Sequence, residues 1–341
     1  MPTIKDVARA AGVSTATVSY VLNNKTASVS EPTRRRVLQA VEELSYTRNV
    51  TARNLRANQT RLIGYALPFT PNPRPNTVLE HFAFHLAREA SLAGYHSLIF
   101  TYAYDDPVSA YDELIRTGRV DAFILANTAF DDPRVAYLLE QGYPFAAFGR
   151  ANPDWDFNWV DTDGKAGVRQ ATDYLIALGH RRIAMVTWPE NSLTGNNRLS
   201  GYLEALVAAG IAARPEYVIR AEYGEAVGGL VFDLLARLPA EEQPTAIVAV
   251  SDMTAISIIG EAERRGHVVG KTLSVVGFDD ELLSQYLRPS LTTLRQPIAA
   301  ISAELVAIVD GLLSGQIAET RQVLMQPEFI VRESVSPPPA G

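Results

Sequence analysis

The segment Ile4–Asn24, IKDVARAAGVSTATVSYVLNN, has the pattern of two short helices joined by a tight turn. In its first half, apolar side chains recur at the spacing of one helical face: Ile4, Val7, Ala8 and Ala11. Thr3 and Asp6 have the spacing of a capping box at the start of this first helix. Gly12 is suited to end it, because glycine readily adopts the left-handed conformation that follows many helices.

A second helix is predicted after Ser14, whose hydroxyl can cap its first turn. The inward side of this helix would carry Val18, Val21 and Leu22, and its outward side Thr15, Ala16, Thr17, Ser19 and Tyr20. This arrangement predicts a helix-turn-helix, whose second helix lies in the major groove of DNA. On spacing alone, any two amphipathic helices around a glycine would give the same pattern.

The run A-x-x-A-G-V-S-x-x-T-V-S-x-V-L-N at residues 8–23 closely resembles the opening of the lac and galactose repressor family of bacterial transcription regulators. The resemblance continues through residues 29–58 and, less densely, to about Glu333. The predicted DNA contacts are Thr15, Ala16, Thr17, Tyr20, Asn23, Arg34, Ala52 and Leu55. Tyr20 departs from the arginine that many members carry, so the usual bidentate contact to guanine is not available.

Composition separates a basic head from an acidic remainder. Residues 1–60 carry 9 Lys and Arg residues and 4 Asp and Glu residues, which gives a net charge of +5. The remaining residues carry 22 Lys and Arg residues and 34 Asp and Glu residues, which gives a net charge of −12. A basic head attracts DNA phosphates and an acidic body is repelled by them, so contact with DNA is expected through the head. For any single residue, including those of the Arg34–Arg36 run, a merely solvated basic face is the alternative.

Length and residue usage exclude several other classes. A chain of 341 residues should form two or three cores. It has no membrane-spanning apolar segment and no apolar signal-peptide core, so we expect a cytoplasmic protein. The absence of cysteine excludes disulfides, cysteine-ligated zinc, iron–sulfur clusters and a thiol nucleophile.

A third helix and a short linker should complete the head. Ser30 and Pro32 predict the start of a helix in which Val37, Leu38, Val41 and Leu44 recur at helical spacing, and Tyr46 would close this domain of residues 1–48. Residues 49–60 should form a linker in which residues 49–58 are a helix too short to persist alone. The family resemblance implies a hinge helix there, with Leu55 wedged into the minor groove of DNA. Packing of Leu55 against the following domain is the alternative.

From Arg61 onward, short apolar runs alternate with helical segments, as in parallel sheets covered by helices. Strands are expected at RLIGYAL, YHSLIFTYA, VDAFILAN, PFAAFGR, RRIAMVTW, EYVIRAEY, PTAIVAVS, LSVVGFDD, LTTLRQP and a final RQVLMQPEFIVRE. Helices are expected near 76–93, 107–118, 132–142, 164–179, 196–210, 225–238, 252–266 and 298–314. The predicted fold is a two-lobed α/β body over residues 61–335. This body resembles the periplasmic-binding-protein-like core of the repressor family, and the resemblance implies three segments of chain that cross between the lobes. Residues 336–341 should be a disordered tail.

Ligands of open parallel sheets bind beyond the carboxyl ends of the strands. Residues that follow the predicted strands are therefore candidate effector contacts: Phe69, Tyr102, Phe148, Arg150, Trp188, Arg198, Ser251, Asp279 and Gln296. Flat aromatic rings beside bidentate donors and acceptors suit a sugar. The resemblance assigns ligand binding to Arg198 in NNRLSGY and Asp279 in VVGFDD, and Gln296 lies in the matching T-T-x-x-Q segment. Ser251 replaces the usual asparagine of the family's N-D motif and removes one donor and one acceptor.

Some of these residues have structural alternatives. Phe148 and Trp188 could be core aromatics, and Arg198 could simply pair with Asp279. Asp163 is expected to cap the helix that begins at Gly164.

Signals of catalysis and metal binding are weak. The stretch Gly266–Thr272 has one residue too few between its glycines for a P-loop and follows a helix rather than a strand. His81 and His85 share a helix face without a third predicted ligand. We therefore expect a homodimeric DNA-binding repressor, with neither metal nor cofactor, controlled by a mono- or oligosaccharide. The alternative is a sugar-handling enzyme or sugar-uptake protein on the same two-lobed body.

Overall fold

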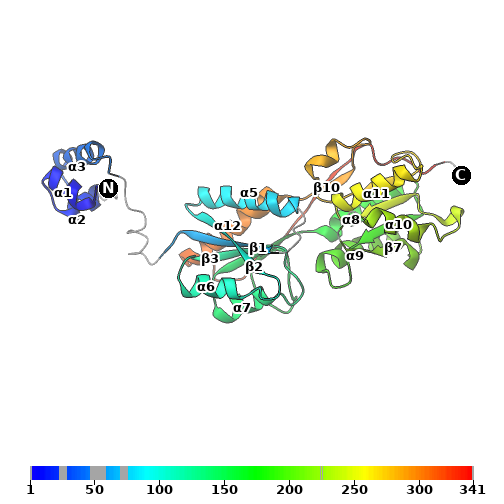
Figure 1. Cartoon of the computed structure of the whole chain (residues 1–341), viewed down its shortest axis with the longest axis horizontal. Helices are drawn as coiled ribbons and strands as arrows, with labels where there is room; N and C mark the ends of the chain where they lie inside the picture. Colours follow the sequence, from blue (N-terminus) through cyan, green and yellow to red (C-terminus); the bar gives the residue numbers. More distant parts are fainter. Residues whose placement is uncertain are drawn as a thin grey trace. The chain divides into compact units, whose positions relative to one another are not determined.

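The computed structural model describes residues 2–22, 29–46, 59–69, 76–222, 224 and 226–339, with the side chain of Phe69 also left aside. Its chain folds as two compact units, Met1–Thr60 and Arg61–Gly341, which we call the head and the body (Figure 1). Residues 49–58, predicted to be the hinge helix, lie outside the described part of the chain.

The head contains three helices: α1 (Ile4–Ala11), α2 (Thr15–Leu22) and α3 (Glu31–Glu43). The predicted capping box is confirmed, since the Asp6 carboxylate accepts hydrogen bonds from the backbone N–H and hydroxyl of Thr3 at 2.9 and 2.7 Å. Gly12 ends α1 with a φ of 62°. The Ser14 hydroxyl accepts a hydrogen bond from the Thr17 N–H at 3.1 Å and caps α2.

Small aliphatic residues fill the core of the head: Val7, Ala8, Ala11, Val18, Val21, Val37 and Ala40. Tyr46 packs against this cluster, as predicted. The expectation that Leu38 belongs to the inner face of α3 is wrong, because its side chain is 44% exposed. The inner face runs through Val37 and Val41, and the next residue along a helix is turned about 100° away from that line.

Lobe one of the body is a parallel six-stranded sheet in the order β11-β5-β4-β3-β1-β2. Its strands are β1 (Leu62–Phe69), β2 (His96–Ala103), β3 (Ala122–Leu125), β4 (Phe145–Phe148), β5 (Trp159–Thr162) and β11 (Gln322–Met325). Helices α5 (Thr77–Leu92) and α12 (Ile298–Ser314) cover one face, and α6 (Ser109–Arg116) and α7 (Pro133–Gln141) cover the other (Figure 1). The α/β prediction is confirmed.

Lobe two has a parallel four-stranded sheet in the order β7-β6-β8-β9. Its strands are β6 (Ile183–Thr187), β7 (Val218–Arg220), β8 (Ala246–Ala249) and β9 (Ser274–Val276). One face is covered by α8 (Gly164–Ala177) and α9 (Leu193–Ala208), and the other by α10 (Val227–Leu235) and α11 (Asp252–Arg264). Short 3-10 turns occupy Pro215–Tyr217, Ala240–Glu242 and Leu282–Gln285. Glycine at 201 lets α9 touch α8, because a Cβ there would lie 2.1 Å from the Lys165 carbonyl oxygen.

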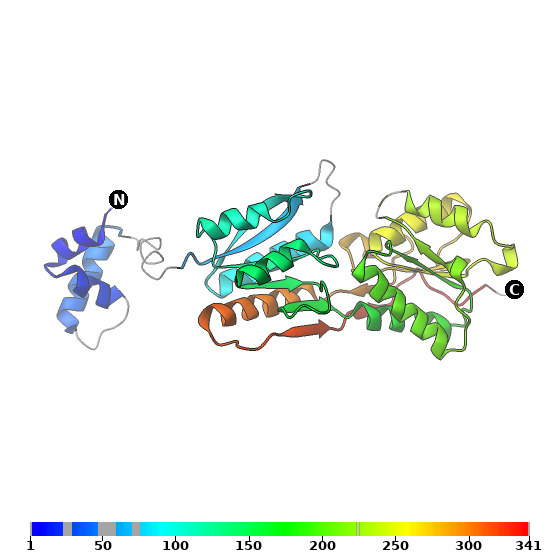
Figure 2. The same cartoon turned by 90° about the horizontal axis from the view of Figure 1, so that it is seen from below.

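Three segments of chain cross between the lobes, as the resemblance implied (Figure 2). They connect β5 to α8, β10 (Thr293–Arg295) to α12, and β11 to β12 (Glu328–Ile330). The prediction of one strand over RQVLMQPEFIVRE is wrong, because β11 belongs to the lobe-one sheet and β12 pairs antiparallel with β10. Pro327 lies at the break, where its missing N–H cannot support a continuous ladder.

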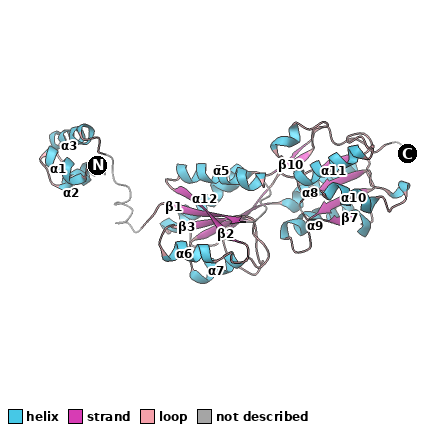
Figure 3. Ribbon diagram, viewed as in Figure 1, coloured by secondary structure: helices cyan, strands magenta, loops and turns pink. Residues whose placement is uncertain are grey.

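The end of the body is more ordered than the sequence suggested. The Ser336 carbonyl oxygen lies 2.8 Å from Nε2 of His180 and accepts a hydrogen bond from the Ser274 hydroxyl at 3.0 Å. The prediction of a disordered tail is wrong at Ser336, because its backbone is held by polar atoms of lobe two rather than by apolar burial. Figure 3 shows the helices and strands of the body and the loops that join them. In the described ranges, none of the helices combines the length and apolarity needed to cross a membrane.

Candidate functional site

The outer face of α2 is the candidate DNA-reading surface of the head. Thr15, Ala16 and Tyr20 are exposed, and the half-buried Thr17 hydroxyl lies 2.9 Å from that of Ser14. These side chains carry no charge, so this face could approach base edges closely while a cation elsewhere contacts phosphate. Arg34 on α3 is one such cation, 3.8 Å from Glu31. Asn23, Ala52 and Leu55 lie outside the described residues.

A cavity of about 150 Å³ lies between the two lobes of the body. Six of the nine predicted effector contacts line it: Phe148, Trp188, Arg198, Ser251, Asp279 and Gln296. Lobe one also contributes Asn127 and Asp161, and lobe two contributes Thr194. Because the walls come from both lobes, a ligand in this cavity would contact the two lobes at once.

Asp279 reaches the cavity from an unusual backbone conformation after β9. Its φ is 124° and that of Asp280 is 55°, values that residues other than glycine rarely adopt. Such strain persists only where the surroundings enforce it, and it is common at binding sites. The side chain of Gln296 donates a hydrogen bond to Oδ1 of Asp279 at 2.7 Å and accepts one from the Thr162 hydroxyl at 2.7 Å. Gln296 thus connects the acid to two of the crossing segments.

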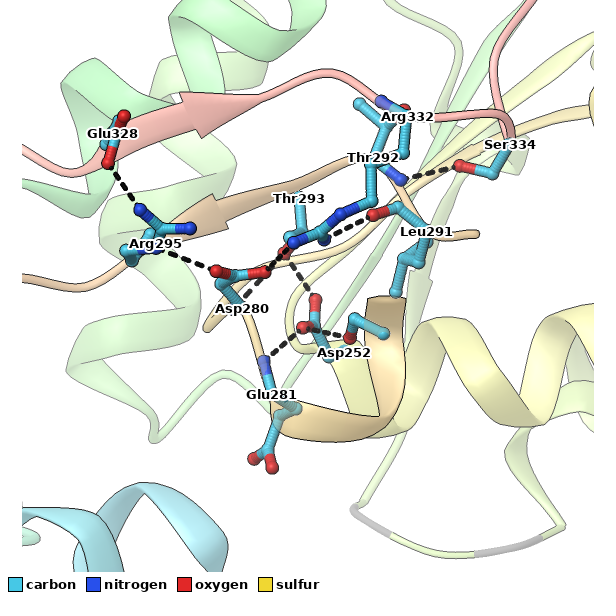
Figure 4. Close-up of polar contacts among 11 residues, drawn as sticks. Asp252, Asp280, Glu281, Leu291, Thr292, Thr293, Arg295, Glu328, Arg332 and Ser334 are labelled. Carbon is cyan, nitrogen blue, oxygen red and sulfur yellow. Dashed lines mark hydrogen bonds and ion pairs between the residues drawn. The ribbon is translucent and has the colours of Figure 1, made fainter. Parts of the chain in front are cut away.

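A polar network enforces this conformation (Figure 4). The buried Asp252 carboxylate accepts hydrogen bonds from the backbone N–H of Glu281 at 2.8 Å and from the Ser284 hydroxyl at 2.6 Å. The Asp280 carboxylate lies between two guanidinium groups, 2.7 Å from Arg295 and 2.6 Å from Arg332. The turn that presents Asp279 is therefore fixed from both sides before any ligand arrives.

Arg198 on α9 is the cation of the cavity. It is only 4% exposed, its Nη1 donates to the Val250 carbonyl oxygen, and its guanidinium carbon lies 3.5 Å from the centre of the Phe278 ring. Among the described residues, its Nε has no hydrogen-bond partner, and neither has Nε1 of Trp188, another residue of the cavity wall. Buried donors without acceptors are costly, so these two groups favour a ligand rich in acceptors.

Among the described side chains, Arg198 and Asp279 form no direct salt bridge, although their opposite charges attract each other. Burial raises the pKa of Asp279 to about 8, opposed by Arg198 and reinforced by Asp252. Burial likewise lowers the pKa of Arg198, opposed by the nearby acids. Both groups carry a desolvation penalty that hydrogen bonds from a ligand could reduce.

Two predicted contacts lie elsewhere. Tyr102 is buried inside lobe one, and its hydroxyl accepts a hydrogen bond from Nη1 of Arg134 at 3.2 Å. It lies within β2, the edge strand of the sheet, and does not line the cavity. Arg150 pairs with Asp161 at 2.8 Å and lines a neighbouring cavity instead. Ser251 lines the cleft, but its hydroxyl caps α11 by accepting from the Thr254 N–H at 3.2 Å.

Sequence reasoning missed several residues of the cavity wall. Asp161 lies on β5, a four-residue strand that was too short to stand out as an apolar run. Asn127 is the second residue after β3, so the rule about strand ends could have found it. Thr77 and Glu281 also line the cavity, and the Thr77 hydroxyl of lobe one donates to the Glu281 carboxylate of lobe two. Only the folded structure brings these two residues together.

Comparisons with known proteins agree with this geometry. Residues 3–49 match the model of bacterial regulatory proteins of the lacI family, and residues 172–335 match that of a periplasmic binding protein-like domain. The helix-turn-helix transcriptional regulator DegA of Bacillus subtilis is 31% identical, with 98% of each chain covered. The chain belongs to the lacI family.

Two solved structures of lacI-type regulators match nearly the whole chain. The transcriptional regulator CelR in complex with cellobiose is 28% identical, with a TM-score of 0.73 over 98% of this chain and 100% of that one. The lac repressor dimer bound to operator and the anti-inducer ONPF is 26% identical, with a TM-score of 0.81 over 98% of this chain and 99% of that one.

Membership of the lacI family confirms the predicted helix-turn-helix transcription regulator and the prediction that the chain is not an enzyme. The P-loop-like glycines fit this conclusion, since Gly266 and Gly270 lie in the turn after α11. His81 and His85 have their Nε2 atoms 3.2 Å apart on α5, and within the described ranges no group of three or more metal-ligating side chains includes them.

Proposed function

We propose that this lacI-family protein is a repressor that binds operator DNA as a homodimer and responds to a sugar held between its lobes. The observation that carries the ligand part is the combination of Asp279, Arg198 and Trp188 in one small cavity, with two buried donors that lack partners in the described part of the chain. A sugar offers hydroxyls that donate to the carboxylate and accept from these N–H groups, and its ring has apolar faces for the aromatic side chains. CelR, a structural relative, holds cellobiose.

The head supports the DNA part of the proposal. A single helix-turn-helix covers only a half-site, so a twofold dimer reading a pseudo-palindrome is the expected arrangement. The lac repressor, a relative over nearly the whole chain, is a dimer on its operator. The uncharged outer face of α2 would read bases through Thr15, Ala16 and Tyr20, while the net charge of +5 over residues 1–60 attracts phosphates.

Control by the ligand requires two states that bind it unequally. Closure of the lobes around a sugar would move them about the three crossing segments. Gln296 is placed to sense this movement, because it links Asp279 to Thr162 on a second crossing segment. We propose that the change reaches DNA through residues 49–60, which would form the hinge, with Leu55 in the minor groove.

Asp279→Ala tests the effector site. At pH about 9, where Asp279 is ionised, loss of this acceptor should weaken sugar binding by about 2 kcal/mol or more, on the scale of a hydrogen bond to a charged group. Operator affinity without sugar should be unchanged. Calorimetry with a panel of mono- and disaccharides measures the first quantity, and fluorescence anisotropy on the promoter region of the protein's own gene measures the second.

Asp105→Ala is the matched control, because Asp105 is an exposed acid of lobe one outside the cavity wall. Wild-type sugar affinity in Asp279→Ala would remove Asp279 from the site. A wild-type protein whose operator affinity is the same with and without saturating sugar would disprove control by that sugar.

A further inference from the structure

A second cavity, of about 440 Å³, lies beside the first and also spans the two lobes. Its walls carry aromatic rings, amide groups and one guanidinium, including Arg150, Trp155, Trp159, Asn196, Asn197 and Gln322. The asparagines belong to the first turn of α9 in lobe two, and the other four residues belong to lobe one. We call the 150 Å³ cavity the inner cavity and this one the outer cavity.

The walls of the inner and outer cavities are linked by residues in contact or adjacent in sequence. The ion pair between Arg150 and Asp161, 2.8 Å long, has its cation in the outer wall and its acid in the inner wall. On α9, Asn197 lines the outer cavity and Arg198 the inner one. Both of these side chains lie close to Gly164, where an added Cβ would be 3.6 Å from Oδ1 of Asn197 and 3.0 Å from Cγ of Arg198.

The loop that carries Trp155 is held in place by its own hydrogen bonds. The Trp155 N–H donates to the Asn152 carbonyl oxygen at 3.1 Å, and Oδ1 of Asn152 accepts from the Asp154 N–H at 2.9 Å. Phe157 at the end of the loop stacks on Phe145 of β4, with ring centres 5.8 Å apart. A platform ordered in advance loses little entropy when a ligand covers it.

The chemistry of the outer cavity favours a neutral, ring-shaped partner. Arg150 is its one charged wall residue among those described, and Asp161 already neutralises it, so no free cation is offered to a phosphate or carboxylate. The Arg150 guanidinium carbon lies 5.9 Å from the centre of the Trp159 ring, and this contact fixes the ring from one side. Indole rings beside amide groups suit a sugar, which is apolar on its faces and polar at its edge.

Size also separates the roles of the two cavities. Pockets for small molecules usually measure about 300–1,000 Å³. The inner cavity, at about 150 Å³, is below this range and suits one sugar ring, whereas the two cavities together fall within it.

We propose that the effector is at least a disaccharide, with one ring in the inner cavity and the next on the Trp155–Trp159 platform of the outer cavity. This inference rests on the proposed function and names the class of sugar. Because Asn196 and Asn197 belong to the other lobe, the second ring would also bridge the lobes and favour their closure.

The test is calorimetry on the full chain with matched sugars: glucose with cellobiose and maltose, galactose with lactose and melibiose, and mannose with mannobiose. A disaccharide should bind at least about tenfold more tightly than its own monosaccharide, a gain that corresponds to burying part of one further ring. Trp155→Ala should remove this gain and leave monosaccharide affinity within about twofold of wild type. Trp155→Tyr, which keeps a flat ring, should restore part of it.

Tyr104→Ala is the matched control, because Tyr104 is an aromatic residue of the same lobe that is 81% exposed and lines neither cavity. Equal affinities for a monosaccharide and its disaccharides would overturn the outer subsite and leave the sugar-responsive repressor intact. The outer subsite would also be overturned if Trp155→Ala weakened the binding of the monosaccharide and the disaccharide by the same factor. Binding of none of these sugars would overturn the sugar proposal itself.

Discussion

The head and the body recognise their ligands in opposite ways. The head keeps its functional residues outside a small core of valines and alanines, so that α2 can present Thr15, Ala16 and Tyr20 to a groove. The body buries its functional residues, and Arg198 and Asp279 are accessible only to a molecule that enters between the lobes. The head therefore depends on very few core contacts, whereas the body depends on a polar network that keeps buried charges in position.

The largest effect should come from disturbing the core of the head. Val18 is fully buried on α2, and Val18→Asp would place an uncompensated charge in a domain whose core is small. Operator affinity should fall at least about 100-fold, because an unfolded head cannot hold α2 in a groove. Sugar affinity of the body should be unchanged. Anisotropy and calorimetry on the same preparation measure both quantities.

Leu38→Asp controls for the added charge, because Leu38 is exposed on α3. This variant should keep the helical circular-dichroism signal of wild type. If Val18→Asp weakened sugar binding as much as operator binding, the two units would not be independent in the way their separate cores imply.

The second effect concerns the polar framework of the body. The buried Ser334 hydroxyl donates to the Val275 carbonyl oxygen at 2.6 Å and accepts from the Thr292 N–H at 2.8 Å. Ser334→Ala leaves both backbone groups without this partner and should lower the free energy of unfolding of the body by about 1–3 kcal/mol. Urea unfolding followed by tryptophan fluorescence measures the change, since all three tryptophans lie in the body.

Operator binding by the head should be unaffected in Ser334→Ala. Ser314→Ala, at the exposed end of α12, is the control and should be nearly neutral. A body as stable as wild type would show that the end of the chain adds nothing to lobe two.

The third effect is a pH dependence that only the body should show. Sugar hydroxyls form the stronger, charge-assisted hydrogen bonds with Asp279 only when it is ionised, and burial raises its pKa to about 8. Sugar affinity should therefore increase from pH about 6.5 to about 9, by up to roughly tenfold for each unit below the pKa, and then level off. Calorimetry across this range tests the expectation.

Asp279→Asn has no such ionisation and should bind weakly with a flat profile over the same range. An equally steep profile in Asp279→Asn would assign the titration to another group, such as Asp252, whose pKa is raised to about 6 by burial.

The sequence predicted the head well because its determinants are local. The capping box at Thr3 and Asp6, the left-handed Gly12 and the Ser14 cap each act within four residues, and a periodic pattern identifies the buried face directly. Leu38 was wrongly predicted to be buried, because it lies next to Val37 in the sequence and the helical spacing of the apolar residues on α3 is the same with or without it. The strand-end rule likewise located Asp279 in the cleft, since parallel strands end at one edge of their sheet. Arg198 on α9 and Gln296 after the antiparallel β10 were located by the family motifs in which they stand.

What only the tertiary structure decided is how distant residues meet. The order of strands in the sheet placed Tyr102 at an edge and Asp161 at the cleft, and no local pattern encodes that order. The pairing of Arg150 with Asp161 arises from the pairing of β4 with β5 in lobe one, and the outer cavity forms where residues of this lobe face the start of α9 in lobe two. The spacing of apolar residues and the capping of helices depend on a few residues close together in the sequence. A binding site depends on strand ends and turns that meet only after the core has formed.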